Sequence, residues 1–177
     1  MSTINVDNIT EYTSGNGVEI PGHILQVVEA TDVTDTSYTG TGPTALGSLN
    51  LSITPKSTSS KILLTATVNL SANGVRYWEL SFYRGSTELG ISDQGTGSQN
   101  NAFIQPNMGD ITEVRYQTLP TTMNYVDSPS TTSAITYSIK IARYSSSTIY
   151  YNRPHTVGDA AYSIFTRSTI QAFEIGG

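Results

Sequence analysis

The sequence predicts an all-β protein, an antiparallel β-sandwich of the jelly-roll type. The first observation behind this prediction is alternation. From Ile62 to Leu70 every second residue is apolar, which is the two-residue period of a strand with one buried face. The second is that turn residues such as Gly, Pro, Asn and Ser recur about every ten residues, a spacing typical of short strands. No segment shows a convincing helical period.

Strands are expected in two groups along the chain, separated by a long glycine-rich loop. Residues 49–53 and 61–70 form the nucleus of the prediction, as two strands joined by a tight polar loop around Pro55. The strand at 23–30 is expected to be covered on both faces, and Pro120 indicates a sheet edge or a bulge. The expected strands are 23–30, 46–53, 61–70, 75–84, 88–92, 113–118, 122–126, 135–144, 148–151 and 167–175, with loops elsewhere.

Composition excludes several classes of protein. The net charge is -5, the isoelectric point is near 4.8 and the nine Lys and Arg residues are scattered, so no nucleic-acid partner is expected. Cysteine is absent, which excludes disulfide bonds and thiolate zinc sites. No apolar run is long enough to span a bilayer, and residues 1–20 lack the layout of a secretory signal. We therefore expect a protein made in the cytoplasm without membrane insertion.

Residues 1–22 differ in character from the rest and are expected to form an N-terminal arm, followed by the sandwich domain over residues 23–177. Short apolar groups flank a glycine turn, and they are too few to build a core. A mobile tail is one interpretation. An arm that orders against sister chains or a docking surface is the other, and the near-regular spacing favours it. The apolar residues of the arm are Ile4, Val6, Ile9, Val18 and Ile20.

Short motifs follow one another along the chain: Ile53-Thr54-Pro55, Ser59-Ser60-Lys61-Ile62-Leu63, Tyr83-Arg84-Gly85-Ser86-Thr87, Asp127-Ser128-Pro129, Thr136-Tyr137, Asn152-Arg153, Ser168-Thr169-Ile170 and Glu174-Ile175-Gly176. In this order the chain resembles the C-terminal domains of tailed-bacteriophage fibre proteins, especially those of aquatic phages. Residues 1–9 are similar to the N-termini of the same group of virion appendage proteins. The resemblance covers nearly the whole chain, and order and spacing carry it.

The resemblance implies a structural protein of the virion, a homotrimer whose sandwich forms a knob broadly similar to the tumour-necrosis-factor and C1q jelly rolls. The arm would attach this knob to other virion proteins, in the capsid or the tail. The arm is too short for a fibre shaft, so a short knob on the tail or baseplate, or a decoration on the head, fits the length better.

Eleven tyrosines and many apolar strand residues exceed what one sandwich interior needs. A threefold interface would cover the surplus. Tyrosines that face water with their hydroxyl groups are the alternative.

No group of residues predicts catalysis, a metal site or a cofactor. The two histidines, His23 and His155, are far apart in the sequence. His155 and Asp159 could form a catalytic triad only with a nearby serine, and in so Ser-rich a chain a nearby serine is expected by chance. Acids that could form a glycosidase pair lie in or beside loops. Asp32 and Asp35 lack the motif of a calcium loop. We therefore expect a protein that is not an enzyme.

Recognition is the chemistry that the sequence favours. Sugar-binding surfaces on β domains combine exposed aromatic rings with amide, acid and guanidinium groups. Packing of Tyr150 and Arg153 inside a trimer interface is an equally weighted alternative. The candidate ligand-binding residues are Tyr150, Tyr151, Asn152, Arg153, His155, Gln99 and Asn100.

The predicted function is that of a structural virion protein of a tailed phage, a short trimeric tail fibre or knob that binds a host-surface glycan. Three weak sites on a common axis would raise the effective concentration of each other's ligand. A capsid decoration or head fibre that stabilises or modifies the shell is the alternative within the same class. A bacterial adhesin or lectin domain, and then a glycan hydrolase, are the alternatives from other classes.

Overall fold

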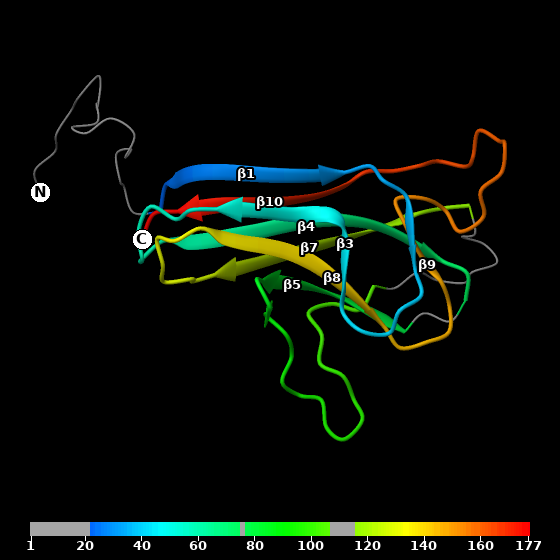
Figure 1. The fold of residues 1–177 in the computed structure, drawn as a ribbon, viewed down its shortest axis with the longest axis horizontal. Coiled ribbons are helices and arrows are strands. Elements are labelled where there is room, and N and C mark those ends of the chain that lie inside the picture. The colour runs from blue at the N-terminus through cyan, green and yellow to red at the C-terminus, as the bar shows by residue number, and fades with distance from the viewer. Residues whose placement is uncertain (1–21, 75–76, 107–115) are drawn as a thin grey trace, which may run out of the picture.

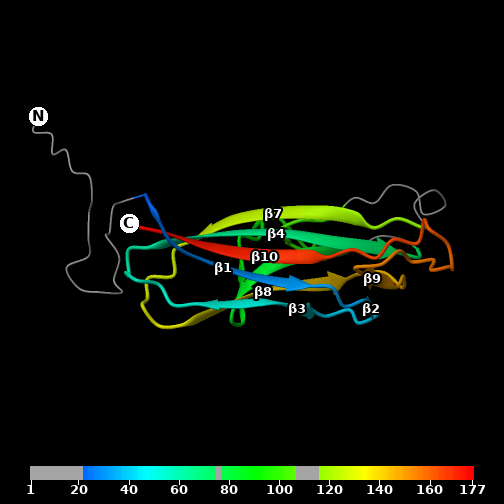
Figure 2. The same cartoon turned by 90° about the horizontal axis from the view of Figure 1, so that it is seen from above.

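The computed structural model describes residues 22–74, 77–106 and 116–177 of the chain. Within these ranges every regular element is a strand, so the all-β prediction is confirmed, and no helix there could cross a membrane. The strands form two antiparallel sheets stacked as a sandwich, which Figure 1 and Figure 2 show in two perpendicular views. They are β1 (Ile24–Asp32), β2 (Thr36–Tyr38), β3 (Thr44–Ile53), β4 (Lys61–Ala72), β5 (Trp78–Arg84), β6 (Thr87–Leu89), β7 (Leu119–Asp127), β8 (Ile135–Arg143), β9 (Ile149–Tyr151) and β10 (Ser168–Ile175).

Connectivity between the two sheets is that of a jelly roll. The larger sheet has the order β1-β10-β4-β7, and β9 and β2 extend it where β10 ends. The smaller sheet has the order β3-β8-β5-β6. Without β2 and β9, the larger sheet contains the first, eighth, third and sixth strands of the sequence, and the smaller sheet the second, seventh, fourth and fifth. This alternation between layers is the double Greek-key order.

The core lies between the sheets and uses the alternate positions that the sequence predicted. On β4 the apolar residues from Ile62 to Leu70 point inward and are buried, while the residues between them are half-buried on the outer face. Burial of one such large side chain stabilises the fold by roughly 1.5–3 kcal/mol. Tyr38, Tyr137 and Tyr151 belong to the same core, so these three tyrosines are not available to an interface.

Pairing between distant segments is where the structure departs from the sequence predictions. The predicted nucleus, β3 and β4, belongs to different sheets, so the polar loop around Pro55 crosses between the layers. The strand β2 lies in a stretch expected to be a loop, because it pairs with β9 through only three residues and is too short to alternate. The strand β1 is not covered on both faces, since Ile24 and Val27 are exposed on it.

The region around Pro120 is a strand edge, as predicted. Pro120 lies inside β7, which pairs with β4 and with no other described strand. Residues 116–118 of the strand expected at 113–118 are not a strand, and residues 113–115 lie outside the described residues.

The described chain enters and leaves the sandwich at the same end (Figure 1). The amide of Gly22 donates to the carbonyl oxygen of Gly176 at 2.8 Å, so the start of the chain is fastened beside its end. The rest of the predicted arm lies outside the described residues, and so do its candidate attachment residues, Ile4, Val6, Ile9, Val18 and Ile20.

Candidate functional site

Two of the predicted ligand-binding residues, Tyr151 and Asn152, are fully buried. Tyr151 lies in β9 and packs edge-on against Tyr38, with 6.4 Å between ring centroids. A side chain without exposed surface cannot contact a ligand at the protein surface. The prediction therefore does not hold for these two residues, whose role is in the fold.

Asn152 fastens three parts of the chain. Its Nδ2 donates to the carbonyl oxygens of Asp32 at 2.9 Å and Thr34 at 3.1 Å, and its Oδ1 accepts from the hydroxyl of Ser168 at 2.7 Å. Its φ of 58° is in the left-handed region, which asparagine tolerates better than most residues. Asparagine at this position thus combines an unusual backbone conformation with a buried polar network.

Asp32 is a buried acid beside this network. Its carboxylate accepts from the amide and hydroxyl of Thr34 at 2.8 and 2.7 Å and from the amide of Ser48 at 2.7 Å. Burial alone would raise the pKa of Asp32, but these hydrogen bonds outweigh it and lower that pKa. Gly47 lies so close that a Cβ there would be 1.9 Å from Asp32 Oδ2. In the described part of the chain, no three His, Cys, Asp or Glu side chains are grouped as metal ligands.

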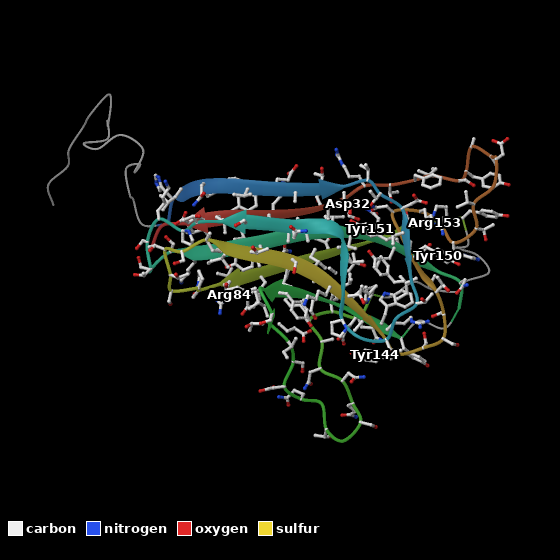
Figure 3. The ribbon with its side chains drawn as sticks, viewed as in Figure 1. Asp32, Arg84, Tyr144, Tyr150, Tyr151 and Arg153 are labelled. Atoms are coloured by element: carbon white, nitrogen blue, oxygen red, sulfur yellow. The ribbon has the colours of Figure 1, made fainter. Side chains whose placement is uncertain are left out.

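Tyr150, Arg153 and His155 form a half-buried cluster. Figure 3 shows Tyr150 and Arg153 toward the end of the sandwich opposite to the C-terminus marked in Figure 1. The guanidinium carbon of Arg153 lies 4.5 Å from the centroid of the Tyr150 ring, and the His155 ring lies 6.2 Å from that centroid. Arg153 Nε is also 3.6 Å from Asp35 Oδ2. The Tyr150 ring and the Arg153 guanidinium group already contact other side chains of the protein, so less of their surface is available to a ligand.

Gln99 and Asn100 line a separate pocket of about 440 Å³. It lies between the loop after β6 and the adjoining ends of β5 and β8. The sequence analysis did not identify the other residues that line this pocket as binding residues, among them Tyr77, Glu79 and Tyr144.

The pocket's tyrosines lie side by side because β5 and β8 are neighbours. Trp78 pairs with Arg143 in the sheet, and the amide of Tyr144 donates to the carbonyl oxygen of Tyr77 at 2.6 Å. Both rings are exposed. The sequence shows Tyr77 on the outer face of its strand, but only the β5–β8 register brings Tyr144 beside it.

Glu79 supplies a carboxylate to this pocket and is only 7% exposed. Burial raises its pKa, a hydrogen bond with the Tyr144 hydroxyl opposes the rise, and the nearby charge of Glu88 adds to it. The partial burial of Tyr144, together with its hydrogen bond to Glu79 and the charge of Glu79, raises the pKa of Tyr144. The two side chains thus form one connected polar pair at the pocket wall.

Hydrogen bonds fix the loop that carries Gln99 and Asn100. The amide of Gln99 donates to the carbonyl oxygen of Thr96 at 3.2 Å, and Gln99 Oε1 accepts from the amide of Thr96 at 3.0 Å. Further along, Ile104 pairs with Leu80 of β5. The amide side chains are therefore presented on a loop that is tied to the sandwich.

A second pocket of about 520 Å³ lies between the segment before β7 and the loop that joins β9 to β10, which we call the distal loops. The residues that line it include Tyr116, Tyr162 and Ile164. The two tyrosine rings meet edge to face with 4.8 Å between centroids. Among the described residues, fewer polar side chains line it than line the Gln99 pocket.

Comparison of the chain with protein-family models and with curated proteins gives no match. The chemistry of the site therefore has to be argued from its residues. Exposed aromatic rings beside amides and a carboxylate can stack on, and hydrogen-bond to, a polar ring compound. The predicted binding residues fall into two groups, one around Tyr150 and one around Gln99. Among the described residues of these two groups, only the pocket around Gln99 has exposed aromatic rings in this combination, because Arg153 lies over the Tyr150 ring.

Proposed function

We propose that the chain is a non-enzymatic structural protein of a tailed-phage virion, a self-associating β knob that binds a host-surface glycan. The observation that carries the proposal is an apolar row on the outer face of the larger sheet. The motif resemblance to phage fibre domains and the jelly-roll strand order support the virion assignment. Threefold symmetry follows from the same resemblance.

The apolar row runs across all four long strands of the larger sheet. The strand registers pair Val27 with Phe173, Phe173 with Leu63, and Leu63 with Val126. Val27 and Val126 are exposed, and the two residues between them are half-buried. Side chains at paired positions lie about 5 Å apart, so these four form a continuous apolar strip.

Toward the strand ends nearest the termini, Ile24 pairs with Ile175, which widens the strip, and the exposed Lys61 pairs with Ile175 at the margin of the strip. In the other direction the next rows consist of uncharged residues except for Glu29. They are Glu29, Gln171, Thr65 and Asn124, and then Thr31, Thr169, Thr67 and Thr122. A large apolar and charge-poor face is typical of an interaction surface.

A second copy of the chain is the partner that fits this face best. Two such faces bring apolar rows together and bury few charges, so little desolvation opposes the contact. Association of identical chains is also the commonest way in which proteins form assemblies.

Size-exclusion chromatography with light scattering tests the proposal through two matched variants. Val126 lies in the apolar row and is 48% exposed, and Val157 lies in a distal loop and is 46% exposed. The wild-type chain should have about three times the 19.0 kDa mass of one chain. Val126→Lys should shift the protein toward the single-chain mass, because it puts an unpaired charge into an apolar contact. Val157→Lys should leave the mass unchanged.

The two variants should have closely similar far-UV circular dichroism spectra, because both positions are exposed in the single chain and neither substitution should change its fold. A wild-type protein that keeps the mass of one chain at high concentration would refute the proposal. So would two variants with equal effects on mass.

A further inference from the structure

We infer that the pocket beside Tyr77 and Tyr144 binds uncharged carbohydrate and discriminates against acidic sugars. The inference rests on the proposed function, since it assigns the glycan to a site and to a chemical class. It uses the Gln99 pocket and not the cluster around Tyr150.

The first argument is the stacking surface. Tyr77 and Tyr144 are both exposed and adjacent across the β5–β8 pair. A pyranose ring has apolar C–H faces that pack well on aromatic rings. Tyrosine offers this contact at a low cost in conformational entropy, because it has few rotatable bonds.

The second argument is the polar lining. The side chains of Ser98, Gln99, Asn100 and Gln105 line the pocket. Hydroxyl and amide groups provide both donors and acceptors, as the hydroxyl groups of a sugar do. The pocket volume of about 440 Å³ is within the range typical of small-molecule sites, roughly 300–1,000 Å³.

The third argument is charge. Glu79 is the acid of this pocket, and none of the described residues that line it is Lys, Arg or His. Lys140, which lies on the same face of the sheet, has its Nζ 4.1 Å from the centroid of the Tyr83 ring and does not line the pocket. Among the described residues of the pocket, a sialic or uronic acid would meet a carboxylate and no cation to balance it, and such unfavourable pairs are a common source of specificity.

The test uses the full chain on an array of neutral hexose and N-acetylhexosamine oligosaccharides, each printed with and without a terminal sialic or uronic acid. Titration calorimetry then measures the affinity for the best neutral oligosaccharide and its acidic counterpart. We expect binding to a neutral oligosaccharide and at least tenfold weaker binding of the acidic form. Absence of binding to every neutral oligosaccharide, or a preference for the acidic forms, would overturn the inference.

Variants locate the site. Tyr77→Ala should weaken binding at least tenfold, whereas Tyr162→Ala should not change it. These positions are a matched pair, because Tyr77 is 56% exposed and Tyr162 is 58% exposed in the distal loop. Unchanged binding by Tyr77→Ala would place the ligand elsewhere and overturn the inference.

Glu79→Gln tests the discrimination, because it removes the charge and keeps the shape. It should reduce the difference in affinity between neutral and acidic oligosaccharides, and an unchanged difference would contradict the role of Glu79. If this buried variant fails to fold, Tyr144→Phe replaces it. Loss of the Tyr144 hydroxyl should lower the affinity for the neutral ligand, and an unchanged affinity would count against the pocket.

Light scattering on the same samples separates this inference from the proposed function. An assembled protein that binds no glycan would refute the pocket alone and favour a capsid decoration. A protein with the mass of a single chain would refute the proposed assembly.

Discussion

Asp32 is a buried residue whose carboxylate links the two sheets. It lies at the end of β1 in the larger sheet and accepts a hydrogen bond from the amide of Ser48 in β3 of the smaller sheet. Its pKa in the folded protein is lowered below the usual 3.8. The group therefore stabilises the fold at pH values above 3.8, and this contribution is lost as the pH falls through the folded pKa.

Replacement of this carboxylate tests the linkage. At pH 7 we expect Asp32→Asn to lower the free energy of unfolding by roughly 2 kcal/mol, because hydrogen bonds to a charged acceptor are lost. As the pH falls through the folded pKa, the wild-type carboxyl group becomes protonated, so the difference should become smaller. Urea denaturation at a series of decreasing pH values measures it, and a difference that does not change with pH would show that packing, not charge, explains the loss.

Asn152 supports the same region through uncharged groups. Its amide connects the carbonyl oxygens of Asp32 and Thr34 with the hydroxyl of Ser168, and its backbone takes a left-handed conformation. In the sequence, the pair Asn152-Arg153 next to two tyrosines has the composition of a sugar-binding surface. Composition does not reveal which of these side chains points inward, so the structural role became clear only from the contacts.

At the scale of elements, the long strands could be predicted because each keeps a strict period over many residues. The positions assigned to the core on β4, from Ile62 to Leu70, and on β8, from Ile135 to Ile141, are buried. A register slip by one residue would expose the whole apolar set, so such strands have one favourable arrangement.

A strand that the sequence missed depends on contacts between distant segments. The strand β2 pairs with β9 through three residues, too few for a period to be visible. The pocket escaped prediction for the same reason. Tyr77 and Tyr144 are distant in the sequence, and only the β5–β8 register makes them neighbours.

A buried polar link couples strands of the two sheets. Asp127 at the end of β7 accepts from the hydroxyl of Tyr137 in β8 at 2.6 Å and from Arg84 of β5 at 2.9 and 3.0 Å. Tyr137 is fully buried and Asp127 nearly so. Burial and the bond to Asp127 together raise the pKa of Tyr137, so it remains a protonated donor at neutral pH.

A double-mutant cycle with Tyr137→Phe and Asp127→Asn measures this link. We expect each single variant to lower the free energy of unfolding, by about 1–2 kcal/mol for the tyrosine and more for the aspartate, whose bonds to Arg84 also weaken. The coupling energy should be about 1 kcal/mol, as is typical for residues in contact. Additive losses in urea denaturation would show that the hydroxyl does not contribute through Asp127.

At the scale of the whole molecule, the two proposed surfaces lie on opposite sides of the sandwich. The apolar row lies on the outer face of the larger sheet, whereas Glu79 lies on the outer face of the smaller sheet, on the strand whose Trp78, Leu80 and Phe82 belong to the core. Association through one sheet would leave the pocket on the other sheet accessible. Several copies could then engage a surface rich in glycans with the avidity of a multivalent ligand.

The charge-poor face also predicts how the assembly responds to salt. Each chain carries a net charge of -5, so electrostatic repulsion opposes association, while burial of the apolar row favours it. Salt screens the repulsion but does not weaken apolar contacts. Between about 0.05 M and about 1 M sodium chloride we therefore expect sedimentation velocity to show an unchanged or tighter assembly. Dissociation at the higher concentration would mean that ion pairs hold the chains together, and the contact would then have to lie outside the apolar row.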